Sequence, residues 1–225
     1  MSAGSPFFSA TESSAPRRDR TRQALLQSAL TEIHGAGFQA ASLSRIVAGA
    51  GVSKGALYHH FPNKLALGYA VFDQPITDYI VKTFIEPLQN AEDPIECMHR
   101  VGTMERDRML EQGVTLGCPL VNLSQEMSPV DEGFRTRIDA LLTLWRNNWA
   151  DALRRGQENG YVRSDIDPIA EATLMIATRQ GSVALTKTAQ SLNLLENVMT
   201  ALISYLDRLR PDDWTSRKAK IGTES

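Results

Sequence analysis

Hydrophobic positions recur every three or four residues along most of this chain, which is the spacing of one face of an α-helix. The first stripe of this kind consists of Leu26, Ala29, Leu30 and Ile33. It predicts a helix that begins near Arg18 or Thr21 and ends at Gly35 and Gly37, because glycine often terminates a helix. No segment alternates hydrophobic and polar residues over the length of a strand, so the pattern predicts an all-α protein.

Two short helices are predicted directly after the first. The apolar face of the earlier one is formed by Leu43, Ile46, Val47 and Ala50. Ser42 is its expected N-cap, and Gly51 can adopt the positive φ that a sharp change of chain direction needs. Ser53 is the expected cap of the second helix, over Lys54–His60. Two short helices joined by a three-residue turn that contains glycine are typical of a helix-turn-helix.

Longer helices are predicted over the remainder of the chain. Pro75 predicts a kink and Pro87 a stop, since proline interrupts the hydrogen bonds of a helix interior. A capping residue followed by proline, which favours a helix start, recurs at Asp93-Pro94, Ser128-Pro129 and Asp167-Pro168. One long helix after the second of these is marked by a single apolar stripe of Phe134, Ile138, Leu141, Leu142, Trp145, Trp149 and Leu153.

The last two predicted helices, about 168–188 and 191–209, carry more apolar surface than one face needs. A heptad-like seam on the final helix comprises Leu192, Leu195, Met199, Leu202, Leu206 and Leu209, and a second stripe flanks it. The helix before it offers small residues that allow close approach. One seam is expected to face the chain's own core and the other a second copy. The predicted dimer interface consists of Ala177, Gly181, Ala184, Leu195, Met199, Leu202 and Leu206.

Composition narrows the class of protein. The chain has 225 residues, of which 42% are hydrophobic and 22% charged, as in a globular protein with room for one or two domains. Cys97 and Cys118 are too few for a disulfide scaffold or a zinc cluster, which favours a reducing cytoplasm. No apolar run reaches the roughly 18 residues that cross a bilayer, and the N-terminal residues lack the pattern of a signal peptide, so no membrane partner is expected.

Charge is distributed unevenly along the chain. Residues 1–65 hold seven basic and three acidic residues, a net charge of +4, whereas the rest holds 17 basic and 23 acidic residues, a net charge of −6. This asymmetry indicates a basic module that meets a polyanion, joined to an acidic module that does not.

Residues 42–64 read SLSRIVAGAGVSKGALYHHFPNK, which resembles the DNA-binding signature of the TetR family of transcriptional regulators. The matching features are Thr21-Arg22, Gly37-Phe38, the Ile46–Ala48 run, Gly51-Val52-Ser53, the segment Leu57–Phe61, and Lys64. The match covers about residues 17–75, while the rest agrees with the family only in being all-α. The resemblance implies a homodimer that binds a palindromic double-stranded DNA operator and releases it when a small-molecule ligand binds, as a repressor or as an activator.

Four segments are therefore expected: a disordered tail over 1–16, a three-helix helix-turn-helix domain over 17–75, a larger helical ligand-binding and dimerisation domain over 76–210, and a polar tail over 211–225.

The second short helix carries the residues that suit DNA. Lys54 can reach a guanine or a phosphate, the small Gly55 and Ala56 let the backbone approach the bases, and Tyr58 and His59 can donate to phosphates. Ser42 and Ser53 either hold phosphates at helix N-termini or serve as caps only. The resemblance implies that the DNA backbone is contacted by Thr21, Arg45, Tyr58, His59 and Lys64. For Arg45, the alternative is a surface charge that only faces solvent. Neighbouring histidines do not share a helix face, so no metal site is expected.

A ligand site in the larger domain should be apolar with a few polar groups. The residues predicted to form it are Met104, Arg108, Cys118, Met127, Phe134, Trp145 and Trp149. For each of them, plain core packing is the alternative. Cys118 precedes Pro119 at a predicted helix start, so it is either a thiol that reacts with an electrophilic or oxidising inducer or a small buried hydrophobe.

Two other functions compete with a ligand-responsive regulator. An all-α enzyme would need a catalytic set, but no nucleophile–base pair, phosphate-binding loop or metal-ligand cluster stands out, and no cofactor is expected. A DNA-binding protein without a sensing role would differ from the regulator in gaining no thermal stability from small molecules.

Overall fold

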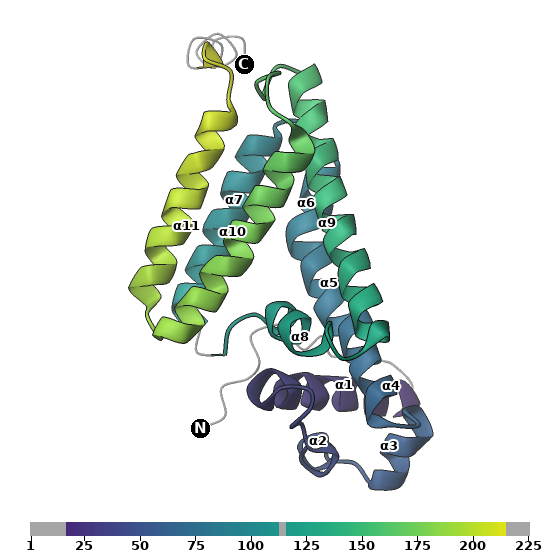
Figure 1. Cartoon of the computed structure of the whole chain (residues 1–225). Coiled ribbons are helices and arrows are strands. Elements are labelled where there is room, and N and C mark those ends of the chain that lie inside the picture. Colours follow the sequence, from purple (N-terminus) through teal and green to yellow (C-terminus); the bar gives the residue numbers. More distant parts are fainter. Residues whose placement is uncertain (1–16, 113–115, 215–225) are drawn as a thin grey trace. The chain divides into compact units, whose positions relative to one another are not determined.

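The computed structural model describes residues 17–112 and 116–214. Every element within these ranges is a helix (Figure 1), which confirms the predicted all-α class. None of these helices is long and apolar enough to traverse a bilayer. The predicted tail over 1–16 and residues 215–225 of the C-terminal tail lie outside the described residues.

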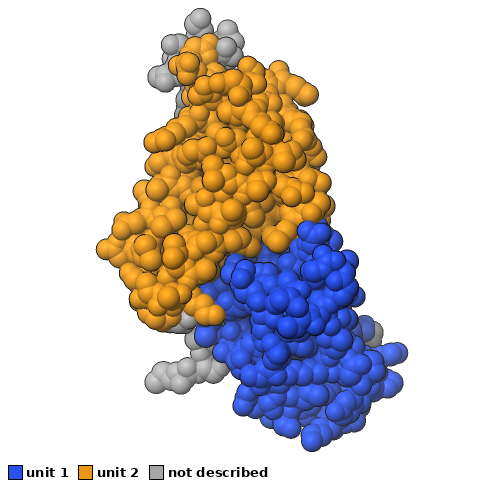
Figure 2. Space-filling model, in the orientation of Figure 1, with its two compact units in different colours: residues 1–80, 116–141 blue, residues 81–115, 142–225 orange. Residues whose placement is uncertain are grey.

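Contacts divide the chain into two compact units (Figure 2). Unit 1 contains residues 1–80 and 116–141, and unit 2 contains residues 81–115 and 142–225. Residues 116–141 thus pack with the helix-turn-helix, whereas the sequence pattern predicts them in the larger domain. The chain passes between the units inside continuous helical stretches at residues 80–81 and 141–142.

Unit 1 is built around the predicted helix-turn-helix. Its elements are α1 (Arg17–Ala36), α2 (Leu43–Gly49), α3 (Lys54–His60), α4 (Lys64–Val71), the π-helical η1 (Phe72–Ile76), α5 (Thr77–Ile80), α8 (Pro119–Met127) and the first part of α9 (Glu132–Glu158). Helix α1 packs against α2, α3, α4 and α8. This arrangement buries the stripe that the sequence predicted for α1, since Leu26, Ala29, Leu30 and Ile33 are all at most 4% exposed.

Local capping rules explain where the two short helices begin. The Ser42 hydroxyl accepts a hydrogen bond from the Arg45 backbone N–H at 3.4 Å, and the Ser53 hydroxyl accepts one from Ala56 at 3.1 Å. Between the helices, Gly51 has φ +64°, a conformation that side chains with a Cβ rarely adopt. The predicted caps and turn are therefore confirmed.

Of three predicted interruptions, two are wrong, each for a local reason. At Pro75, where a kink is predicted, the regular α-helix gives way to the π-helical η1 and the chain then continues as helix. Pro87 stands in the first turn of α6, where proline is tolerated, so it does not stop the helix. Ser128 ends α8 instead of beginning α9, because the Asp131 carboxylate accepts from the Phe134 backbone N–H at 2.8 Å and takes the capping role.

Unit 2 is a bundle of longer helices. Its elements are the π-helical η2 (Val81–Ile85), α6 (Glu86–Gln89), α7 (Pro94–Gln112), the rest of α9, α10 (Pro168–Ala189), α11 (Leu192–Leu206) and the short η3 (Asp207–Leu209). Helix α11 packs against both α7 and α10, and Figure 1 shows the three side by side. In the core, the rings of Trp145 and Phe84 stack at 4.7 Å, and Trp149 meets Trp145 edge to face at 5.7 Å.

Candidate nucleic-acid interface and ligand pocket

Helix α3 presents one face to its own unit and the other to solvent. Leu57 and Phe61 are 2% and 4% exposed and anchor the helix. Tyr58 is 53% exposed, and Lys54 and His59 are also exposed. The exposed face thus carries a cation, a phenol and an imidazole, a set that can donate hydrogen bonds to phosphate and base oxygens.

The N-terminal end of α3 carries no bulky side chain that would keep another molecule away from its backbone. Gly55 is exposed, and a Cβ built at that position would meet only the Ser53 hydroxyl, at 3.7 Å. Ala56 is half-buried. The start of the helix therefore carries little side-chain bulk beyond Lys54, as close approach to base edges requires.

Positive charge gathers near the C-terminal end of α3. Burial lowers the pKa of His60, and the neighbouring charges of His59, Arg18 and Arg22 lower the pKa further. Arg22 also lies over the Phe61 ring, 5.5 Å from its centre, and donates to Gln74 at 2.6 Å. Two arginines of α1 therefore add to the positive field of α3, which agrees with the uneven charge of the sequence.

Arg45 and Lys64, which are predicted to contact the DNA backbone, already have partners inside the protein. Arg45 forms an ion pair with Glu32, with Nε 2.8 Å from Oε1, and its hydrogen bond holds the pKa of the Glu32 carboxyl below its usual range. Lys64 donates from Nζ to the Gln39 carbonyl at 2.9 Å and lies over the Phe38 ring. Each would have to share or exchange this partner to hold a phosphate. Glu32 and Gln39 were missed because nothing local in the sequence pairs them with residues 13 and 25 positions away.

The two serines and Thr21 are placed differently. Ser42 and Ser53 both cap their helices, which is compatible with either alternative, and Ser53 is also exposed. Thr21 is half-buried on α1.

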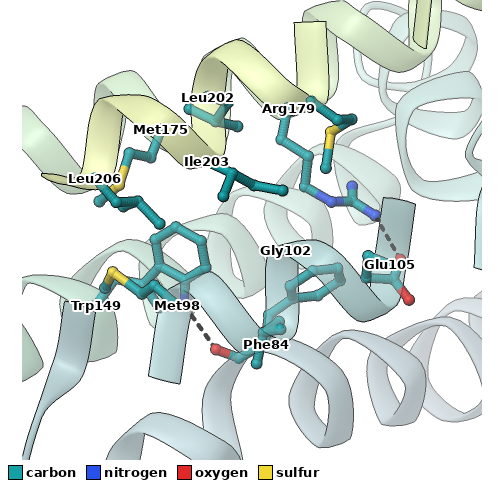
Figure 3. Close-up of a pocket in the computed structure, with 12 residues that line it drawn as sticks. Phe84, Met98, Gly102, Glu105, Trp149, Met175, Arg179, Leu202, Ile203 and Leu206 are labelled. Carbon is teal, nitrogen blue, oxygen red and sulfur yellow. Dashed lines mark hydrogen bonds and ion pairs between the residues drawn. The ribbon is translucent and has the colours of Figure 1, made fainter. Parts of the chain in front are cut away.

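Unit 2 contains a narrow pocket of about 40 Å³ between helices α7, α9, α10 and α11 and the η2 segment (Figure 3). Its apolar lining consists of Phe84, Met98, Val101, Gly102, Trp149, Met175, Met199, Leu202, Ile203 and Leu206. The helices α7 and α11 approach closely here, as the space around Gly102 shows. A Cβ built at Gly102 would lie 3.1 Å from Cγ1 of Ile203. The volume is far below the ~300 Å³ of a usual small-molecule site, so side chains must move before such a ligand fits.

A buried ion pair interrupts this apolar lining. Arg179 of α10 is 4% exposed and Glu105 of α7 is 3% exposed, and Arg179 Nη2 lies 3.3 Å from Glu105 Oε2. Arg108 contacts the same carboxylate from the adjacent turn, at 2.8 Å and 3.0 Å. The Arg179 guanidinium also lies over the Phe84 ring, 4.3 Å from its centre. Two cations therefore share one carboxylate in a site that is otherwise apolar.

The structure does not bring the predicted ligand residues together. Trp149 lines the pocket, its indole N–H donating to the Phe84 carbonyl at 2.6 Å, and Arg108 contacts Glu105. Trp145 is buried behind Phe84, and Met104 is 63% exposed, so both lie off the lining. The remaining three are core residues of unit 1, namely Cys118, Met127 and Phe134.

Neither cysteine offers an exposed thiol. Cys118 is 6% exposed at the N-cap position of α8, and Cys97 is 1% exposed on α7. Burial raises the pKa of the Cys97 thiol, which donates to the Pro87 carbonyl at 3.3 Å. Both positions match the small buried hydrophobe that was the alternative for Cys118.

Glu105 and Arg179 were missed, although the sequence contains a signal for both. Glu105 follows Met98 and Val101 on one face of α7, and Arg179 follows Ala172 and Met175 on one face of α10. A single charged residue on an otherwise apolar face must find a partner inside the fold, because burying an unpaired charge is costly. Two such residues of opposite sign on neighbouring helices predict an ion pair.

The predicted dimer interface separates into two sets. Ala177, Gly181 and Ala184 are exposed on α10, together with Leu174 at 48% and Leu185 at 57% exposure. Leu195, Met199 and Leu206 are at most 4% exposed within the single chain, and Leu202 lines the pocket. Leu195, Met199 and Leu206 therefore face the chain's own core, and assigning these three to the interface was wrong, whereas Leu202 is only half-buried and its place in an interface stays a prediction.

Two family models match the chain. Residues 25–71 match the model described as "Bacterial regulatory proteins, tetR family", which spans α2, α3, α4 and most of α1. Residues 101–202 match "Tetracyclin repressor-like, C-terminal domain", which covers much of unit 2.

Relatives of the full chain agree with these matches. The chain is 27% identical to the transcriptional regulator AcuR of Cereibacter sphaeroides over 77% of this chain and 79% of that protein. It is 26% identical to the HTH-type transcriptional repressor DhaR of a Mycobacterium species over 84% and 93%. Among solved structures, a TetR transcriptional regulator from Chloroflexus aurantiacus superposes with a TM-score of 0.76 at 26% identity, covering 85% of this chain and 96% of that one. The reduced form of Escherichia coli NemR gives 0.72 at 27% identity, covering 81% and 94%.

Proposed function

The chain belongs to the TetR family of transcriptional regulators, and we propose that it is a repressor that binds a palindromic operator as a homodimer and releases it when a small molecule binds. The repressors DhaR and NemR among its relatives support the sign of regulation. Because this family consists of regulators, an enzymatic function is not proposed.

The observation that carries the proposal is the exposed face of α3. Lys54, Tyr58 and His59 face solvent from a short helix that Leu57 and Phe61 anchor to its unit. The start of this helix carries little side-chain bulk, which suits insertion into the major groove. The positive charge of α1 and α3 suits contact with the phosphates on either side of that groove.

The exposed stripe on α10 supports a homodimer. Small residues at 177, 181 and 184 lie beside Leu174 and Leu185, which form an apolar face that no other part of residues 17–112 and 116–214 covers. A contiguous exposed apolar face marks an interaction surface, and small residues let two helices approach closely. A second copy of the same face is the proposed cover, since a two-fold dimer would present two α3 helices to two half-sites.

The pocket of unit 2 is the proposed ligand site. It is too small as it stands, so a ligand must bind a widened form better than the narrow one, and only this difference in affinity can shift the protein between states. Two lining residues belong to continuous helical stretches that run into unit 1: Phe84, four residues after Ile80, and Trp149 on α9. A displacement at either residue can therefore reach the DNA-binding unit through the chain itself. Since both thiols are buried, the proposed ligand binds without a covalent bond.

The test is DNA binding by matched single variants. Genomic fragments are enriched on the wild-type protein and sequenced, and affinity for the enriched site is measured for Lys54→Ala, Tyr58→Phe and the control Lys82→Ala. Lys82 is exposed in unit 2, away from α3 in the sequence. Loss of Lys54 should weaken binding by about 1–3 kcal/mol if it reads a guanine. The control should bind like the wild type.

Two outcomes would contradict the proposal. An equal loss for Lys82→Ala would mean that the affinity reflects overall charge and not α3. No enriched sequence, with binding that simply falls as salt rises, would leave a non-specific DNA-binding protein.

A further inference from the structure

The pocket of unit 2 has two chemically different ends. Figure 3 shows Arg179 and Glu105 at one end of the lining and Trp149, Met175 and Leu206 at the other. A ligand that occupies both ends needs an apolar body and a single polar head, because each surface is satisfied only by its own kind of group.

The head group meets a cluster of one carboxylate and two guanidinium groups. Arg108 holds Glu105 through two contacts, Nε to Oε1 at 2.8 Å and Nη2 to Oε2 at 3.0 Å. Arg179 reaches the same carboxylate through the longer contact of 3.3 Å. If Arg179 turns to an anion of the ligand, Glu105 keeps its bidentate partner. The exchange therefore leaves Glu105 paired, and this keeps the free-energy cost of the exchange low in a buried site.

Other head groups fit this cluster less well. A cationic head would have to approach Glu105 beside two guanidinium groups, and like-charge repulsion in a buried site opposes that approach. A neutral amide can accept a hydrogen bond from Arg179, but a bond between a cation and a neutral acceptor is weaker than one between two ions. The cluster therefore selects for an anion.

We propose that the pocket takes an amphiphilic carboxylate, with its head group on Arg179 and its apolar body against Trp149 and Leu206. This names the ligand class of the pocket and rests on the proposed function for its regulatory consequence. The narrow cavity must widen to admit such a molecule, and the three methionines at positions 98, 175 and 199 are the lining residues best able to rearrange, because their side chains are unbranched and flexible.

The experiment is a calorimetric titration of the full chain, without DNA, with straight-chain carboxylates from butanoate to dodecanoate and with the amide and the amine of each length. We expect the best carboxylate to bind about ten- to a hundredfold more tightly than its amide, and the amine not to bind. Equal affinity of carboxylate and amide, tighter binding of the amine, or no binding by any carboxylate of the series would each overturn the proposal.

Two variants at the polar end should change the affinity in opposite directions. Arg179→Gln should remove the preference for carboxylate over amide. Glu105→Gln should tighten carboxylate binding, since it removes the carboxylate that competes with the ligand for Arg179, while amide binding stays unchanged. The control is Arg154→Gln, which removes an arginine from an exposed ion pair with Asp151 and should leave all affinities as in the wild type. If Arg179→Gln fails to fold, Glu105→Gln decides, and weaker carboxylate binding by that variant would overturn the proposal.

Failure of the pocket chemistry and failure of the proposed function are distinguishable. The titrations need no operator, so their outcome stands whether or not the chain binds DNA. The affinity for the enriched operator is then measured with and without the best carboxylate. Tight carboxylate binding that leaves DNA affinity unchanged would support the ligand class and contradict release by that ligand.

Discussion

Lys54 and Arg179 are both cations, and their surroundings give them different uses. Lys54 is exposed, so it can meet a phosphate or a base edge at little desolvation cost, and salt should weaken that contact. Arg179 is 4% exposed between aromatic rings and a carboxylate, where electrostatic interactions are stronger and more selective. Burial therefore separates a residue proposed to contact DNA from one proposed to select a small ligand.

His60 predicts a pH dependence of stability. Its pKa is lowered from the usual 6.5, first by burial and then by the charges of His59, Arg18 and Arg22. The unfolded chain therefore binds this proton more readily than the folded protein. The stability contributed by neutral His60 is fully present above about pH 6.5 and is lost as the pH falls through the lowered folded pKa.

Urea unfolding at about pH 7.5 and about pH 5.5 measures this effect. We expect the wild type to lose more stability on acidification than His60→Gln does. His99→Gln serves as the control for removal of a histidine elsewhere, in unit 2. An equal loss of stability in the wild type and His60→Gln would contradict the assignment.

Elements differ in how far the sequence predicts them. The starts of α2 and α3 were predicted because a cap and a turn involve residues at most four positions apart. At Ser128 the local pattern favoured the wrong one of two nearby caps, and it could not predict that Asp131 also accepts a hydrogen bond from the Tyr69 hydroxyl at 2.7 Å, because these residues are 62 positions apart. The pocket was missed for the same reason, since its lining comes from five segments of the chain and periodicity indicates which face is buried but not which faces meet.

Helix α8 is joined to the turn after α1 by one of its carboxylates. Its Glu126 carboxylate accepts hydrogen bonds from the backbone N–H groups of Phe38 and Gln39, both at 2.8 Å, and so joins residues 116–141 to the turn after α1. A glutamine there keeps one acceptor oxygen and presents an NH₂ group to the other N–H.

We therefore expect Glu126→Gln to lower the free energy of unfolding of unit 1 by about 1–2 kcal/mol, measured by urea denaturation. The matched control is Glu132→Gln, whose carboxylate is exposed and pairs only with side chains of its own helix among the contacts described. A loss no larger than that of the control would contradict a joining role for Glu126.

The whole molecule is proposed to act as a pair of chains, and α10 carries that prediction. Ala184 is exposed on its apolar face, so Ala184→Glu would place two charges against each other across a two-fold interface. We expect this variant to shift the protein towards the monomer in analytical ultracentrifugation and to bind the operator more weakly. Ala140→Glu introduces the same side chain at an exposed position of α9 and should leave a dimer. A dimer in both variants would place the interface elsewhere.

A hydroxyl-radical footprint of the wild-type protein on its enriched operator tests the central claim most directly. Two α3 helices related by a two-fold axis predict two symmetric protected patches, whose centres are separated by one helical turn of about 34 Å or a multiple of it. Protection should weaken at both patches together in Lys54→Ala. A single unsymmetric patch, or protection that Lys54→Ala leaves intact, would contradict a dimer that reads DNA with α3.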